Sequence, residues 1–313
     1  MDKKALQQAV ADGVLSQKQA DELVNRDSAD GNGAEQLRFL RSFGDIFIAL
    51  GVVLVVLAGH ALVTGPVALL VCMGACIAAS EFLIRRKRLV LPGKALLLGL
   101  LSYLDEWLAF PDGVLGWLIY AAVAGLFYWR YRLPFAFMVI VGCLALAVYH
   151  QLVAMGVERQ VYLAITVLMG LVVFAVAMWF DQQDTARDTR LSDTAFWLHL
   201  VAAPMITHGV MISYIVNTQS FGGMVPVLFY VLFFAVALFV DRRALVVSGL
   251  AYMIGTLVIN GLRHQVLNVD SALWALVVLG VAAVVIGVYW YALRRLIFGW
   301  ARRTPLARYV PTF

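Results

Sequence analysis

The chain has 313 residues, of which 63% are hydrophobic and only 14% are charged, and its mean hydropathy is +0.87. Soluble domains use roughly 45–50% apolar and about 25% charged residues, so this composition excludes an ordinary soluble protein. The net charge of +5 does not indicate nucleic-acid binding, because the basic residues lie beside the ends of apolar segments, where lipid headgroups and topology account for them.

The N-terminal 36 residues are polar and predict a small element outside the membrane. Residues 1–26 have the pattern of a cytoplasmic helical hairpin with a central Asp-Gly break. Ser16 and Gln19 have the spacing of a capping box that opens the second helix. Residues 27–36 are rich in Asp, Asn, Gly and Ser, which predicts a flexible linker.

Residues 37–293 predict a transmembrane helix bundle. Each apolar segment must be a helix, because an isolated strand would leave backbone groups unpaired in lipid. The third segment is the least regular, because Lys94, Asp105 and Glu106 interrupt it. The fold class is therefore all-α and polytopic, with about ten spans at 43–63, 66–84, 89–110, 114–129, 133–153, 160–180, 195–216, 224–240, 244–262 and 271–292.

The distribution of Lys and Arg gives an independent test of this threading, because cytoplasmic loops carry an excess of them. With ten spans and both termini inside, 21 of the 24 basic residues fall on the inner side. The exceptions are Arg159 and Arg263 outside and Lys94 within a span. Residues 294–313 become a basic cytoplasmic tail. At the inner end of the second span, Glu81 and Arg85 have the spacing of a helical salt bridge.

Two N-terminal stretches carry a resemblance to a known group of proteins. The segment Ala11-Asp12-Gly13-Val14-Leu15-Ser16-Gln17-Lys18-Gln19-Ala20 and the entry Gly44-Asp45-Ile46-Phe47-Ile48-Ala49-Leu50-Gly51-Val52-Val53 resemble uncharacterised bacterial membrane proteins of the DUF2157 and DUF4401 kind. The resemblance covers the first 60 residues best. It implies a bacterial inner (plasma) membrane setting and a soluble hairpin before closely spaced spans, and it carries no activity, cofactor or mechanism.

Histidines and carboxylates collect toward the predicted outer side of the bundle. This set consists of His60, His150, His208 and His264, together with Asp105, Glu106, Glu158 and Asp270. Such groups can form a proton relay, a divalent-metal site or a haem ligand pair. No HxxxH or ExxH spacing places two of them on one helix face, so any site depends on how different helices pack. The alternative is that the imidazoles only anchor helices at the membrane interface.

The seventh span has the densest polar content of the regular spans. Pro204 removes the hydrogen bond to the carbonyl of Leu200, which predicts a kink and exposed backbone groups around a cavity. His199 and His208 would stand roughly 13 Å apart along the helix axis, so they can bracket a cavity but cannot share a metal ion. Close helix packing through Ala202 and Ala203 is the structural alternative.

These features favour a small-solute transporter or permease with proton coupling. A non-catalytic membrane partner or assembly factor, docking through its N-terminal hairpin, is the alternative. A redox or metal-binding membrane enzyme that uses the outer histidines is a third hypothesis. No GxSxG, HExxH, CxxCH or Walker-type sequence supports enzymatic chemistry, and no particular cofactor is indicated.

Overall fold

The computed structural model describes residues 3–22, 43–109, 113–185, 187, 189–218, 224–254 and 269–304. These residues are helical and contain no strand, as the all-α prediction requires. The chain divides into two compact units, Met1–Arg38 and Phe39–Phe313. The predicted linker at 27–36 and His264 lie outside the described residues.

The N-terminal unit contains helix α1 (Lys3–Ala11) and a second helix whose described part covers residues 17–22. Between them Gly13 has a φ of 72°, which a glycine adopts without the Cβ penalty of other residues. The capping box is present: the Ser16 amide donates to the Gln19 side chain at 2.9 Å, and the Gln19 amide donates to the Ser16 hydroxyl at 3.3 Å.

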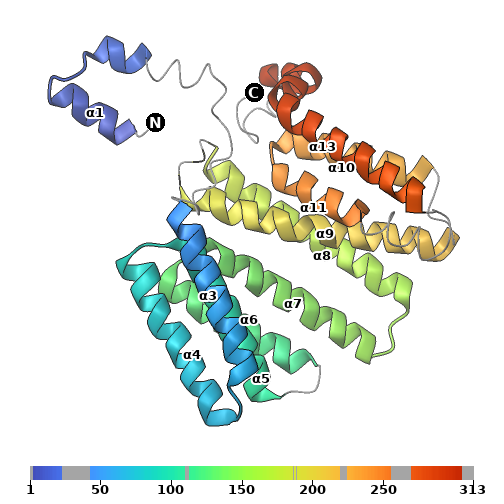
Figure 1. Ribbon diagram of the computed structural model, residues 1–313. Coiled ribbons are helices and arrows are strands. Elements are labelled where there is room, and N and C mark those ends of the chain that lie inside the picture. Colours follow the sequence, from blue (N-terminus) through green and yellow to red (C-terminus); the bar gives the residue numbers. More distant parts are fainter. Residues whose placement is uncertain are drawn as a thin grey trace. The chain divides into compact units, whose positions relative to one another are not determined.

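The second unit is a bundle of helices (Figure 1). Each of the ten predicted apolar segments coincides with one of them, although the ninth is described only as far as Ile254. In chain order they are α3 (Phe43–Leu62), α4 (Pro66–Ser80) with its π-helical extension η1 (Glu81–Arg86), α5 (Val90–Leu108), α6 (Val114–Tyr131), α7 (Pro134–Ala154), α8 (Arg159–Gln183), α9 (Arg190–Thr218), α10 (Met224–Val240), α11 (Arg243–Ile254), α13 (Val269–Phe298) and the short η3 (Gly299–Arg303).

Six stretches of the described chain are long and apolar enough to cross a membrane, so the chain is a multi-pass membrane protein. They are Phe43–Leu62, Pro66–Arg86, Pro134–Ala154, Arg159–Gln183, Arg190–Tyr214 and Leu276–Ala301. Helices α5, α6, α10 and α11 are not among the six, and α5 carries the Lys94, Asp105 and Glu106 that interrupt the third predicted span. Ten spans therefore remain a prediction.

The apolar surface of the bundle faces outward on most helices. Only 6% of the most apolar window of α3 is buried, and Leu54, Val55 and Leu57 all expose more than half of their area. In α9, by contrast, half of the corresponding window is buried. Figure 1 shows α9 beside α8, with α7 on one side and α11 on the other, and α9 contacts all three. Helix α9 is therefore the central helix of this unit.

Two apolar cores lie on either side of α9. The first is built from α4, α5, α6 and α7, with Leu97 and Ala124 fully buried, and Trp197 of α9 packs against it. The second joins α9, α10, α11 and α13, with Ala203 of α9 and Trp290 of α13 at its centre. Helices α3–α7 thus form one group and α8–α13 a second, and α9 of the second group packs against the cores of both.

Three turns between helices, α4–α5 (after η1), α6–α7 and α10–α11, share one backbone feature. Each has a residue in the left-handed region, Arg88, Arg132 or Asp241, with φ between 51° and 58°. One further residue follows, and then α5, α7 or α11 begins. In the second and third turns that following residue is buried: Leu133 exposes 2% of its surface, and Arg242 exposes only 1%. Arg242 thus places a guanidinium where Leu133 buries an apolar side chain.

Helices α9 and α13 extend beyond the predicted spans 195–216 and 271–292. Helix α9 is a single helix that continues through Pro204, with Ala202, Ala203 and Ile206 buried around it. Helix α13 has a local break in its helical geometry at Tyr289 and extends to Phe298. Arg294 therefore belongs to a helix, and its side chain is 2% exposed, whereas the sequence pattern predicts it in the basic tail.

Candidate functional site

A polar site lies between α3 and α5, where His60 is surrounded by three residues of α5. The His60 Nδ1 is 2.6 Å from a carboxylate oxygen of Glu106, and its Nε2 is 2.9 Å from the Ser102 hydroxyl. The imidazole ring stacks on Tyr103, with ring centroids 4.3 Å apart and planes inclined by 20°. We call His60, Ser102, Tyr103 and Glu106 the His60 site.

The hydrogen bonds of Ser102 let the His60 site hold either of two proton arrangements. Its hydroxyl oxygen lies 2.9 Å from His60 Nε2 and 2.9 Å from the carbonyl oxygen of Gly99. When the hydroxyl donates to this carbonyl, its oxygen can accept a hydrogen bond from a protonated Nε2. When it rotates to donate to Nε2, that nitrogen carries no proton, and the Nδ1–H donates to Glu106 in both cases. One proton can therefore bind without movement of any heavy atom.

Tyr103 is anchored as well as stacked. Its hydroxyl donates to the backbone carbonyl of Val56 at 2.9 Å, and its side chain is buried. Gly59 lies directly against this hydroxyl, because a Cβ at Gly59 would overlap the Tyr103 hydroxyl oxygen. Gly99 of α5 similarly faces Val56, where a Cβ would come within 2.7 Å of a methyl carbon. Two glycines thus allow α3 and α5 to approach closely at the His60 site.

Two other predicted residues lie on a neighbouring chain of contacts. The Tyr120 hydroxyl of α6 donates to Asp105 of α5. Tyr120 in turn contacts the ring of Trp117, whose centroid is 5.9 Å from that of His150 on α7. The structure therefore brings His60 together with Glu106 directly, and connects Asp105 with His150 only through two aromatic rings.

The two predicted histidines of α9 lie apart from each other. His208 is on an exposed face of the helix, whereas His199 is fully buried and its Nε2 is 2.9 Å from Asp181 of α8. Pro204 is half-buried between them, in a helix packed against α8. Where the two helices meet, a Cβ at Gly170 would come within 2.8 Å of an Ile206 side-chain carbon. Helices α8 and α9 are therefore closely packed at Gly170 and Ile206, next to Pro204.

His199 belongs to a cluster of buried charges at the ends of α8 and α10. Arg242 binds the Asp181 carboxylate through two nitrogens. Its Nε donates to one carboxylate oxygen at 3.0 Å, and its Nη2 donates to the other. The same Nη2 donates to the hydroxyl of Ser192 at 3.1 Å and to its carbonyl at 3.3 Å. Asp181, Ser192, His199 and Arg242 are all less than 7% exposed.

Asp241, the residue before Arg242, forms the other half of the cluster. Its carboxylate accepts a hydrogen bond from the Trp290 indole at 2.7 Å and pairs with Arg187 at 3.1 Å. Arg294 lies 3.9 Å from the same carboxylate and donates to the carbonyl of Leu238 near the end of α10 at 3.1 Å. These contacts tie α13 and the α8–α9 connection to the α10–α11 turn. The name buried charge cluster refers to Asp181, Arg187, Ser192, His199, Asp241, Arg242, Trp290 and Arg294.

A second buried cation reaches α9 from the opposite side. Lys94 of α5 is 7% exposed, and its Nζ lies 4.2 Å from the ring centroid of Trp197 and 5.9 Å from that of Phe135. It also interacts electrostatically with Asp193, the neighbour of Ser192 in the first turn of α9. The start of α9 is therefore held by Lys94 from one group of helices and by Arg242 from the other.

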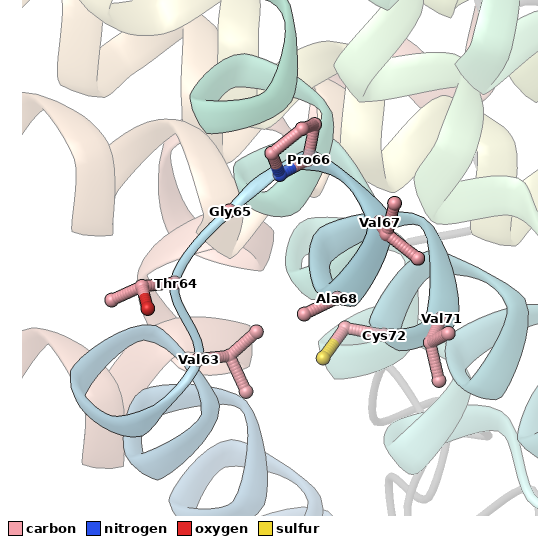
Figure 2. Close-up of a pocket in the computed structure, with 8 residues that line it drawn as sticks. All are labelled: Val63, Thr64, Gly65, Pro66, Val67, Ala68, Val71 and Cys72. Atoms are coloured by element: carbon pink, nitrogen blue, oxygen red, sulfur yellow. The ribbon is translucent and has the colours of Figure 1, made fainter.

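An open pocket of about 530 Å³ lies at the turn between α3 and α4. Figure 2 shows the Cys72 thiol and Val63 facing the space between the turn and α4, with Thr64 directed away from it. The lining is almost entirely apolar, and none of the sequence-predicted candidate residues belongs to it. Cys72 and Val63 also pack on the first core, which includes Tyr103.

Most residues of the His60 site and of the buried charge cluster were not predicted from the sequence, among them Ser102, Tyr103, Asp181, Asp241 and Arg242. The spacing of Ser102 and Glu106, four residues apart on one face of α5, was a usable signal. Arg242 was counted only as a loop cation, and Asp181 ends an apolar run without a local partner.

The predicted salt bridge at the inner end of the second span is confirmed. Arg85 lies 3.2 Å from Glu81, and Arg130 of α6 joins the same carboxylate at 2.8 Å. This pairing ties the end of η1 to the end of α6.

Within the described ranges, no group of three His, Cys, Asp or Glu side chains is placed to hold a metal ion. Comparisons with protein-family models, with curated proteins and with solved structures found no match to this chain.

Proposed function

We propose that the chain is a bacterial inner-membrane transporter for a small solute, coupled to protons through the His60 site. In this proposal all ten apolar helices cross the membrane and both termini are cytoplasmic. The sorting of basic residues supports this threading, and it places His60, near the end of α3, at the outer side. The resemblance of residues 11–20 and 44–53 to bacterial membrane proteins of the DUF2157 and DUF4401 kind supports the bacterial setting.

The geometry of His60, Ser102 and Glu106 is the observation that carries the proposal. A proton-coupled carrier needs a group that binds and releases a proton near neutral pH, and histidine is suited to this. The side chains of His60 and Glu106 are 28% and 42% exposed, so the protein does not enclose the pair. Because Ser102 accepts or donates as required, neither protonation state leaves a ring nitrogen unpaired.

Currents driven by a pH gradient test the proposal. Purified protein is reconstituted in liposomes on a solid-supported membrane and exposed to amino acids, sugars, organic acids and amines. We expect transient currents with at least one of these classes, and their loss in His60→Gln and Glu106→Gln. Ser102→Ala should reduce them, because the alanine cannot serve both proton arrangements.

The control is His208→Gln, since His208 lies on an exposed face of α9, a helix that contributes no residue to the His60 site. Its currents should match those of the wild type. Absence of current with every class of solute, or equal currents in His60→Gln and the wild type, would contradict the proposal.

A role as a membrane partner or assembly factor is the second candidate, and the separate N-terminal unit favours it. Met1–Arg38 forms its own compact unit, with Leu6 and Ala20 buried within its short helices. If this unit docks to another protein, deletion of residues 1–35 should abolish co-purification of that protein from membranes. Unchanged co-purification would remove the reason for this candidate.

A further inference from the structure

We propose that Tyr103 is the positioning residue for His60, and that the absence of a side chain at Gly59 leaves the space that the Tyr103 hydroxyl occupies. This inference rests on the proposed function only for its consequence in transport, because the positioning itself is a property of the His60 site. The groups that hold the imidazole in this site come from α5: Ser102 and Glu106 at its two nitrogens and Tyr103 at its face. Since α3 supplies His60 itself, the ring orientation depends on how α5 docks.

Tyr103 fixes His60 in two ways at once. Its ring covers one face of the imidazole, with the two ring centroids 4.3 Å apart, and so limits how far the imidazole can turn. Its hydroxyl donates a hydrogen bond to the carbonyl of Val56. In an α-helix this carbonyl also accepts the hydrogen bond of the His60 backbone N–H, four residues later. The same side chain therefore restrains both the imidazole and the helical turn from which it projects.

Gly59 makes this arrangement possible and provides a specific test. An alanine at 59 would overlap the Tyr103 hydroxyl oxygen, and its Cβ would also come within 3.1 Å of the ring carbon that bears it. In Tyr103→Phe the overlapping oxygen is absent, so the second contact needs a shift of only a few tenths of an ångström. Gly59→Ala should therefore disturb His60, and Tyr103→Phe should largely rescue it. Gly51 on the same helix provides the matched control, because a Cβ added there would have no atom within 4 Å.

The charged and titratable groups that face the His60 site come from two elements of the described chain. From α5 this is Glu106, in direct contact with His60. From α4, Cys72 and Cys76 both interact electrostatically with Tyr103, and Cys72 also forms a hydrogen bond with it. Changes at Gly59 and Tyr103 alter none of these groups, so their effects report the position of the imidazole rather than a new charge.

The experiment records the ring resonances of histidine-labelled protein in nanodiscs, where the chain has only five histidines and His60 is identified by its loss in His60→Gln. Tyr103→Leu should remove the ring-current shift of the His60 signals, as should Gly59→Ala. Tyr103→Phe, Gly51→Ala and the double variant Gly59→Ala/Tyr103→Phe should retain most of it. Unchanged His60 signals in both Tyr103→Leu and Gly59→Ala would overturn the inference.

Transport is the second readout and separates the two proposals. A stacked aromatic contact contributes about 0.5–1.5 kcal/mol, so proton-driven current in Tyr103→Leu should fall about 2- to 13-fold. Shifted His60 signals in a protein that carries no current would leave the positioning role intact and refute the transport proposal. Full current in Tyr103→Leu, together with loss of current in His60→Gln, would refute the positioning role alone.

Discussion

Two aspartates, Asp181 and Asp241, each make several polar interactions although they lie at the ends of apolar helices. Asp181 accepts hydrogen bonds from both His199 and Arg242, and Asp241 accepts from Trp290 and pairs with Arg187. Buried charges are expensive to desolvate, and such pairs are tolerated only when the remaining donors and acceptors are satisfied. The buried charge cluster is therefore sensitive to the loss of one member.

Removal of one partner from the central pair should cost more than removal of both charges together. We expect Arg242→Met to lower the free energy of unfolding by about 3–5 kcal/mol, because it leaves Asp181 buried with less compensation. The double variant Asp181→Asn/Arg242→Met should be more stable than the sum of the two single effects predicts. Denaturant titration of the wild type and the three variants in detergent gives the coupling energy.

The neighbouring arginine provides the control for this cycle. The Arg243 guanidinium lies over the rings of Trp290 and Tyr291, at 5.6 Å and 5.2 Å from their centroids. Loss of such aromatic contacts costs less than loss of a buried ion pair, so Arg243→Met should cost about 1 kcal/mol or less. Strict additivity at Asp181 and Arg242 would show that the two side chains do not stabilise each other.

At the scale of helices, the pairing of α8 with α9 depends on two glycines. A Cβ at Gly209 would overlap a Val167 methyl group and approach the carbonyl oxygen of Leu163 to 2.8 Å. A Cβ at Gly170 would meet the backbone nitrogen of Ile206 at 3.1 Å. Backbone atoms cannot move aside as flexible side chains can, so the two helices must separate to accept a larger residue.

Alanine at these glycines should destabilise the protein, although alanine is the better helix former. We expect Gly209→Ala to cost about 1–3 kcal/mol, the range for overpacking. Gly142 of α7 has open space where a Cβ would lie, so Gly142→Ala should be neutral or stabilising by up to about 1 kcal/mol. Thermal unfolding in the same detergent compares them, and equal melting temperatures for the two variants would show that the α8–α9 contact is not close-packed.

Helix positions could be predicted from the sequence because the apolar runs and the turns between them are local signals. The predicted span that ends at residue 63 and the proline at 66, for example, indicate the α3–α4 turn, and in the structure α3 ends at Leu62 and α4 begins at Pro66. The partners of Asp181 could not be predicted, because Arg242 is 61 residues away and only the packing of α8 against the α10–α11 turn brings them together. For the same reason His60 and Glu106 were both candidates, while their direct contact was not foreseen.

For the whole molecule, the open question is which helices cross the membrane. Cysteine labelling in cells answers it, starting from a variant in which Cys72, Cys76 and Cys143 are alanine. Thr64→Cys and Met155→Cys should react with a membrane-impermeant maleimide added outside, and Lys87→Cys and Thr185→Cys should react only after permeabilisation. Because all four positions are exposed, protection reflects the membrane rather than burial.

Ala109→Cys tests whether α5 and α6 cross the membrane, since neither is among the six long apolar stretches. It follows the last residue of α5 and is exposed. Ten spans require that it is labelled from outside in intact cells. Labelling only after permeabilisation would mean that α5 and α6 enter the membrane without crossing it, and that Glu106 does not reach the outer side.

The distance along the chain between Asp181 and Arg242 also bears on biosynthesis. At about 5–20 residues per second, a ribosome needs roughly 3–12 s to make the 61 residues that separate them. Throughout that interval the nascent chain holds a carboxylate that is destined for burial, and of its partners His199 and Arg242 only the histidine can already have been made. A polypeptide that stops before the α10–α11 turn would have this carboxylate without its arginine partner, a feature by which cellular proteolysis can distinguish unfinished copies from complete ones.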